Sequence, residues 1–278
     1  MSTPTQLPEK EFDVWERWWN SIDGVPGEIV WDADESDLMA DLDLFADAFA
    51  PNLPVVDLGC GDGRQTRFLA RHFDTVVGID ISPAAIERAR AAENQPNVSY
   101  RVLDARFPEA AERLHAELSD ANVYVRGVLQ ALPAADRPDA IRSIAALVGG
   151  TGTLFAKELP PQAGAYFAEQ VQRHGMWPEL ERVMRLIPPG QITEQELASL
   201  FSPDRFEVIG TGASHIRTVN ALPDGEPIRV PAIYLLARQR RGASAGLITL
   251  AAWRGAPAVA QGEAIEDRVK VRGSRHRQ

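Results

Sequence analysis

The sequence predicts an α/β fold, a doubly wound seven-stranded sheet that is mostly parallel with an antiparallel last strand. Seven apolar segments rich in β-branched residues alternate with stretches of helical periodicity, a pattern typical of βαβ units with helices on both faces of a sheet. A glycine-rich loop directly follows the first segment, and the last two segments follow one another as a hairpin-like pair. Right-handed crossovers then restrict the topology.

The elements can be placed in order along the chain. Ser82, an N-cap residue, and Pro83, at the first helical position, mark a helix start. Gly149 ends a second helix, and a capping box at Thr193 begins a later one. We expect strands at 53–58, 75–80, 97–104, 122–127, 153–158, 205–214 and 228–238. We expect helices at 64–73, 82–93, 134–150 and 193–201, and two more within 165–190, broken near residues 175–178.

Both ends of the chain differ from this central pattern. Residues 11–22 and 36–49 each carry an apolar stripe at helical spacing, and the first stripe is rich in tryptophan. Residues 239–278 carry eight Lys or Arg against three Asp or Glu without clear periodicity, so we expect a weakly ordered basic tail. The predicted organisation is an N-terminal helical cap at 1–50, a central domain at 51–238 with a helical insertion at 161–204, and the tail at 239–278.

The composition excludes several classes of partner. The formal net charge of −10 argues against general binding to nucleic acid or to an anionic membrane, which needs a basic face. No uninterrupted apolar run of about 18 residues is present, so we expect neither a membrane span nor a signal peptide. Cys60 is the only cysteine, which rules out an internal disulfide and favours a cytoplasmic setting. The histidines show no metal-ligand spacing, and we expect no metal site.

The glycine-rich loop in "VVDLGCGDGR" has glycines at every second position, Gly59, Gly61 and Gly63. A dinucleotide-binding loop needs glycine or alanine at the sixth position counted from Gly59, where this chain has Arg64. A pyrophosphate also prefers the bare positive end of a helix, whereas this loop begins at Asp57 and carries a second acid. A cationic ligand without a phosphate therefore fits the loop better.

The segment "VDLGCGDGR" closely resembles the first motif of class I methyltransferases that depend on S-adenosylmethionine (SAM), an acid followed by G-x-G-x-G. Asp80 ends the second strand and matches the acid that binds both ribose hydroxyls in that family, with Ile81 against adenine. Asp104 matches the acid that receives the adenine amino group. The resemblance implies a Rossmann-like fold. It implies cofactor contacts by Asp57, Gly59, Gly61, Gly63, Asp80, Ile81, Asp104, Ala105 and Arg126.

Residues around the expected crevice are candidates for binding the methyl acceptor. Arg126 and Glu158 end the fourth and fifth strands and should face this crevice, unless they form a salt bridge at the edge of the sheet. The aromatic stripe of 11–22 is either ordinary packing or a lid, and residues 161–190 form a second wall. The predicted acceptor contacts are Trp15, Trp18, Trp19, Arg126, Glu158 and Tyr166.

The resemblance implies an enzyme that transfers the SAM methyl group to a small, partly hydrophobic acceptor by in-line displacement, leaving S-adenosylhomocysteine (SAH). The nucleophile is O, N, S or C. A general base helps when the nucleophile carries a proton, and His174, His215 and Glu158 are candidates. A protein or peptide methyltransferase and a non-catalytic SAM-binding protein stay open as alternatives. The expected partner is a small-molecule acceptor, and the expected assembly is a monomer or homodimer.

Overall fold

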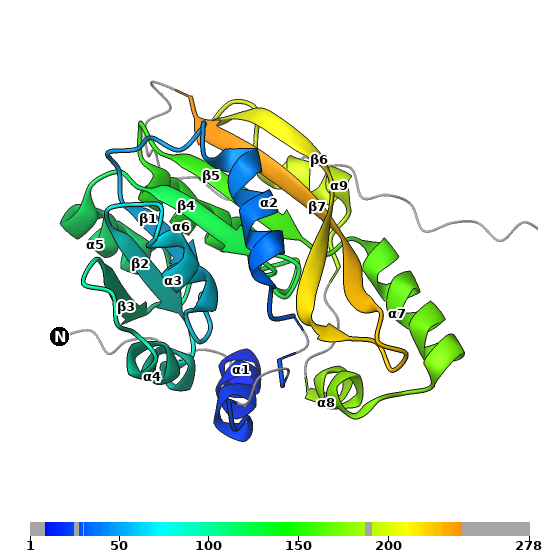
Figure 1. Ribbon diagram of the computed structural model, residues 1–278. Helices are drawn as coiled ribbons and strands as arrows, with labels where there is room; N and C mark the ends of the chain where they lie inside the picture. Colours follow the sequence, from blue (N-terminus) through cyan, green and yellow to red (C-terminus); the bar gives the residue numbers. More distant parts are fainter. Residues whose placement is uncertain (1–8, 25–27, 30, 187–190, 241–278) are drawn as a thin grey trace, which may run out of the picture. The chain divides into compact units, whose positions relative to one another are not determined.

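A seven-stranded sheet with the strand order β3-β2-β1-β4-β5-β7-β6 organises the chain (Figure 1). The computed structural model describes residues 9–24, 28–29, 31–186 and 191–240, so the predicted tail lies outside it from residue 241 onward. β1 to β5 are parallel, and β7 is antiparallel to both β5 and β6, which confirms the predicted sheet. The strands are β1 Val55–Leu58, β2 Val76–Asp80, β3 Val98–Val102, β4 Asn122–Arg126, β5 Thr153–Glu158, β6 Phe206–Ala221 and β7 Pro227–Gln239.

Helices cover both faces of this sheet. Alternate residues of a strand point to opposite faces, so Val56 packs in the core under α5 and α6, whereas Val55 packs in the core under α2 and α3. In Figure 1 α2 and α3 lie in front of the strands, and α5 and α6 lie behind them. The helices are α1 Glu9–Ser21, α2 Glu35–Phe45, α3 Arg64–Leu69, α4 Pro83–Ala91, α5 Pro108–Leu118, α6 Arg137–Val148, α7 Pro161–His174, α8 Pro178–Leu186 and α9 Glu194–Leu200. In the described ranges no helix is long and apolar enough to cross a membrane.

The local signals in the sequence mark most helix ends correctly. The Ser82 side chain accepts a hydrogen bond from the amide of Ala85, and Thr193 forms a complete capping box with Glu196. The sequence interpretation missed α5, and it placed the end of α3 four residues too far along the chain. It also ended β6 at residue 214, whereas the strand continues to Ala221.

The extra length of β6 belongs to a hairpin that extends past the parallel strands. β5 pairs only with Ile233–Arg238 of β7, so residues 227–232 pair with β6 alone. One face of this extension is apolar and buries Ile216 and Val230 against Ala163 of α7 and Leu180 of α8. The helical insertion therefore packs its own apolar residues onto the hairpin.

A buried cluster of charges attaches α2 to the central strands. Lys157 of β5 has no exposed surface, and its Nζ lies 2.6 Å from Asp41 Oδ1 and 3.2 Å from Asp37 Oδ1. Arg126 of β4 contacts Asp37 Oδ2 through Nη2 at 3.0 Å, and the Tyr124 hydroxyl donates to Asp41 Oδ2. Charges removed from water must be paired, so this cluster permits only one position of α2 on the sheet.

The cluster makes a prediction about stability. Asp41→Asn conserves the side-chain volume but removes a carboxylate from buried Lys157, so we expect a loss of about 3–5 kcal/mol in the free energy of unfolding. Asp43→Asn is the matched control, because Asp43 is exposed on the same helix, and its loss should stay within about 0.5 kcal/mol. Denaturant unfolding measures both. Equal losses in the two variants would show that the cluster does not hold α2.

Candidate functional site

The loop between β1 and α3 brings backbone close to three different side chains. Gly59, Gly61 and Gly63 have φ values of 79°, 54° and 79°, a left-handed conformation that side chains rarely adopt. A Cβ at Gly61 would lie 2.7 Å from the Trp19 ring, and Cβ atoms at the other two glycines would overlap Val128 and Tyr100. Backbone conformation and space therefore both require glycine at these positions.

Two buried carboxylates flank the loop. Asp80 accepts hydrogen bonds from the amide of Gly61 to Oδ2 and from the amide of Ser82 to Oδ1, each at 2.9 Å. Asp57 accepts a 2.6 Å hydrogen bond from the Thr66 hydroxyl. Burial raises the pKa of Asp80 to about 6 and the pKa of Asp57 to about 7. Hydroxyl donors or a positive charge nearby would stabilise their ionised forms.

The segment after β3 contains an arginine that the sequence interpretation missed. Arg106 donates to both carboxylate oxygens of Asp104, at 3.1 Å from Nε and 3.0 Å from Nη2. The main-chain oxygen of Ala105 accepts from the Ser143 hydroxyl, which fixes this turn against α6. The spacing of Asp104 and Arg106 in "DAR" was the available signal. Ile81 lies half-buried directly after β2.

The tryptophans of α1 differ in their surroundings. Trp19 is 4% exposed and packs on Gly61. Trp18 has no exposed surface, because Trp31 lies 5.2 Å from its ring and the Arg182 guanidinium covers it at 5.6 Å. Trp15 is half-buried, edge-on to the same Trp31 ring. Trp18 is thus packed in the core in this conformation, and its contact with an acceptor stays a prediction.

Polar contacts at the middle and at the C-terminal end of α1 attach it to α4. Glu16 accepts from the Ser82 hydroxyl at 2.5 Å and from the amide of Ala84 at the start of α4. Arg88 of α4 donates to the main-chain oxygens of Trp19 and Ile22, at the C-terminal end of α1. Glu16 and Arg88 were not singled out in the sequence, since only the fold brings α1 to α4.

Arg126 and Glu158 have buried partners. Besides its pair with Asp37, Arg126 donates to the main-chain oxygen of Trp31, and its buried Nε has no partner among the described residues. Glu158 has no exposed surface and accepts the amides of residues 128, 129 and 130, while burial raises its pKa to about 7. Among the described residues Glu158 forms no salt bridge, and its carboxylate is buried against these three amides, so its contact with an acceptor stays a prediction.

The two candidate histidines and Tyr166 belong to the insertion and the hairpin. His174, at the end of α7, lies 3.4 Å from Asp224 in the β6–β7 turn, and His215 is exposed on β6. The Tyr166 hydroxyl accepts from the amide of Arg229 of β7. In the described part of the chain these side chains make no hydrogen bond to the glycine loop.

The groups around the loop suit a ligand with hydroxyls and a positive centre. Asp80 and Asp57 supply hydrogen-bond acceptors. Arg126 lies close enough to Asp57 for its positive charge to lower the pKa of that carboxyl, and its Nε, which has no partner among the described residues, can donate to a carboxylate of the ligand. SAM, the cofactor that the sequence motif implies, carries ribose hydroxyls, a positive sulfonium and a carboxylate that match these protein groups. The described residues contain no cluster of three His, Cys, Asp or Glu side chains arranged for a metal ion.

Comparison with known proteins gives consistent matches. A family model described as a methyltransferase domain matches residues 55–152. A solved structure of a SAM-dependent methyltransferase from Anabaena variabilis ATCC 29413 is 32% identical, with a TM-score of 0.76, and the match covers 82% of this chain and 95% of that one.

Curated relatives match over shorter segments. Trans-aconitate 2-methyltransferase from Methylobacterium radiotolerans is 40% identical over 88 residues, which are 30% of each chain. Ubiquinone biosynthesis O-methyltransferase from Actinobacillus pleuropneumoniae is 30% identical over 139 residues, 49% of this chain and 55% of that one. The chain thus spans about half or less of the length of these two relatives.

The packing of Trp19 on the loop leads to a test with a matched control. Gly175 also has positive φ, at 76°, but nothing lies within 4 Å of a Cβ placed there. We expect Gly175→Ala to cost about 1–3 kcal/mol, because its φ of 76° with a ψ of 175° is a conformation that almost only glycine adopts. Gly61→Ala should cost about 1–3 kcal/mol more because its Cβ meets Trp19. Thermal unfolding measures the difference.

A double-mutant cycle with Trp19→Ala assigns that extra cost to the ring. The added loss at Gly61 should disappear when the indole is absent. If Gly61→Ala and Gly175→Ala cost the same, α1 does not pack on the loop as described.

Proposed function

Because the chain belongs to the SAM-dependent methyltransferases, we propose that it methylates a small, partly apolar acceptor bound beside the glycine loop. The observation that carries the proposal is the Asp80 carboxylate, which is bonded to the Gly61 amide at the end of β2. It lies beside the glycine loop at the carboxyl end of β2, the edge at which open α/β sheets bind their ligands.

Bound SAM supplies a methyl group on a positively charged sulfur. In our proposal Asp80 accepts the ribose hydroxyls through lone pairs that its two backbone hydrogen bonds leave free. Asp57 stabilises the positive end of the cofactor, and Arg126 Nε donates to its carboxylate. Ile81 and Asp104 hold the adenine, and Trp19 excludes water from the loop.

Two observations support a small acceptor. Trp19 covers Gly61 and packs in one apolar cluster with Trp15 and Trp31, which favours a covered site over an open groove for a protein chain. Two of the curated relatives are named for trans-aconitate and for ubiquinone biosynthesis, which are small molecules. None of the three candidate bases contacts the loop, so we propose that positioning of the nucleophile provides most of the rate.

We place the reaction in the cytoplasm. Cys60 is buried beside Asp80 and Asp57, and burial raises the pKa of its thiol. A thiol in that state is unreactive and forms no disulfide, which suits a reducing compartment.

The decisive experiment is a methyl-transfer screen with labelled SAM over small alcohols, phenols, amines, thiols, carboxylates and peptides. Label on a small molecule with equimolar SAH would support the proposal. Label found only on peptides would contradict the proposal that the acceptor is a small molecule. SAM binding without transfer to any acceptor would favour a binding protein over an enzyme of this type.

The role of Asp80 predicts a change in cofactor affinity. Asp80→Ala removes the ribose acceptors, and loss of hydrogen bonds to a charged group costs about 1.5–3 kcal/mol, or roughly ten- to a hundred-fold in the SAM dissociation constant. Asp74→Ala is the control, since Asp74 is exposed before the opposite end of β2. Calorimetric titration measures both. Unchanged affinity in a folded Asp80 variant would remove Asp80 from the cofactor site.

The raised pKa values predict a pH dependence. Asp57 and Asp80 are largely protonated in the free protein below their pKa values of about 7 and about 6. A positively charged ligand favours the ionised forms, so binding releases protons and SAM affinity should rise between pH 5.5 and 7, by up to about ten-fold per pH unit for each group. Titration in two buffers with different ionisation enthalpies counts the protons. Asp57→Asn should lower the number of protons released on SAM binding. A SAM affinity that does not change with pH would contradict the assignment of Asp57 and Asp80 to the cofactor site.

A further inference from the structure

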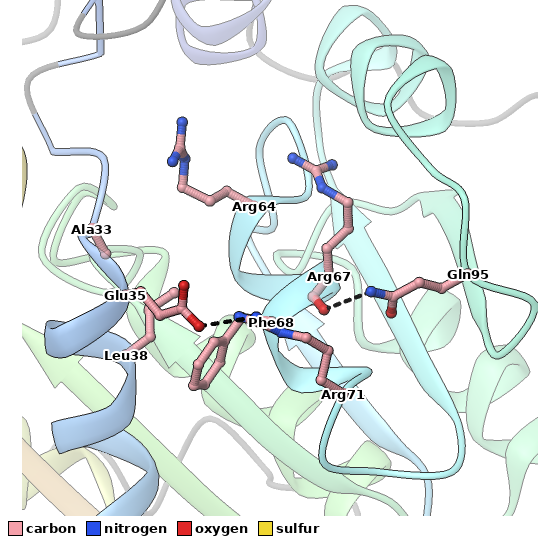
Figure 2. Close-up of a pocket in the computed structure, with 8 residues that line it drawn as sticks. All are labelled: Ala33, Glu35, Leu38, Arg64, Arg67, Phe68, Arg71 and Gln95. Carbon is pink, nitrogen blue, oxygen red and sulfur yellow. Dashed lines mark hydrogen bonds and ion pairs between the residues drawn. The ribbon is translucent and has the colours of Figure 1, made fainter.

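A cavity of about 240 Å³ lies between α2 and α3 (Figure 2). Arg64 and Arg67 line it from α3, Arg71 from just beyond the end of that helix, and Glu35 from α2. Leu38 and Phe68 provide apolar surface. The lining therefore holds three guanidiniums and one carboxylate, in a chain with a net charge of −10.

The three arginines differ in how far their charge is already compensated. Arg71 is fully engaged, with Glu35 at 2.9 Å and the Phe68 ring at 5.0 Å. Arg64 contacts Asp32 through Nη2 at 3.2 Å, and its buried Nε has no partner in the described ranges. Arg67 donates from Nη1 to the main-chain oxygen of Asp62, and it forms no ion pair with any described residue.

A polar side chain on the far wall is also only partly used. The Gln95 amide nitrogen donates to the main-chain oxygen of Arg67, while its buried Oε1 has no partner in the described part of the chain. Figure 2 shows the guanidiniums of Arg64 and Arg67 directed to the same side, away from Arg71. Asp32 compensates the charge of Arg64, so Arg67 supplies the positive charge that no described carboxylate pairs, in a cavity that Leu38 and Phe68 also line.

The cavity adjoins the candidate cofactor site. Arg64 directly follows Gly63, and the bond from Arg67 to Asp62 joins the wall of the cavity to the glycine loop. On the α2 side the wall includes Ala33, two residues after Trp31, whose main-chain oxygen binds Arg126.

We propose that this cavity binds the carboxylate or phosphate group of a small molecule, with Arg67 and Arg64 as the donors. Arginine forks match both anions, and such bonds are about twice as strong as neutral ones. The volume is smaller than the roughly 300–1,000 Å³ of sites for drug-sized ligands, which fits a compact anion with a short apolar part. The assignment rests on the proposed function only where the anion belongs to the methyl acceptor.

Anion binding is tested without any methyl transfer. The full chain, saturated with SAH, is titrated with malonate and with inorganic phosphate at constant ionic strength. We expect binding to the unaltered protein, and an affinity at least about ten-fold lower in Arg67→Gln.

Arg101→Gln is the matched control. Arg101 also bonds a main-chain oxygen and forms no ion pair in the described ranges, but it does not line the cavity. It should bind both anions like the unaltered protein. Equal anion affinity in the Arg67 and Arg101 variants overturns the proposal, and so does a protein that binds neither anion.

Titration with SAM distinguishes this site from the cofactor site. SAM affinity should change less than about two-fold in Arg67→Gln. A ten-fold loss would show that Arg67 serves the carboxylate of the cofactor, which overturns the proposal but leaves the methyltransferase assignment intact.

Kinetics then identify the source of the anion, once the screen has found an acceptor. Malonate that competes with the acceptor, with a raised KM in Arg67→Gln, places the anionic group on the acceptor. Malonate that changes kcat without competition places it on a separate effector. Both results support an anion site, and a failed acceptor screen leaves the binding result unaffected.

Discussion

The pairing of the buried Lys157 ammonium with two carboxylates of α2 determines how α2 and the residues before it are placed on the central strands. Lys157 cannot be solvated inside the sheet, so Asp37 and Asp41 must stay beside it and α2 can take only one position. The start of α2 then holds residues 31–34 in place, where Trp31 supports the tryptophans of α1 and Ala33 bridges to Thr218 of β6. Helix α1 is therefore connected to the hairpin through this cluster, to which the hairpin itself contributes the amide of Arg217, a donor to Asp37 Oδ1.

The elements of this fold are largely predictable because their signals are local. Alternating apolar segments locate the strands, and side chains within four residues locate the caps at Ser82 and Thr193. The same holds for Asp80, since a motif on consecutive strands predicts that it lies next to the Gly61 amide. Helix α5 is the exception. Its start at Pro108 is a recognisable signal, but only Ala111 and Leu114 are buried on it, so its apolar stripe is short.

Roles that depend on distant partners could not be predicted. Glu158 has the type and position of a catalytic acid, yet it stabilises a turn made of amides 28 to 30 residues earlier in the chain. Trp18 belongs to an amphipathic stripe, but whether its ring is open depends on Arg182 in α8. Arg64 and Arg67 look like solvent-exposed helix residues until α2 provides the opposite wall of a cavity.

The position of β7 inside the sheet has a consequence for how the protein is made. β7 is the last strand of the sheet to be synthesised, but it lies between β5 and β6. β5 ends at Glu158 and its first partner in β7 is Ile233, so about 75 residues must be added before that side of β5 is covered. At about 5–20 residues per second this takes roughly 4–15 s, much longer than hydrophobic collapse. During translation the nascent chain therefore exposes an unpaired edge that contains Leu154, Phe155 and Ala156, and a molecular chaperone has time to bind there.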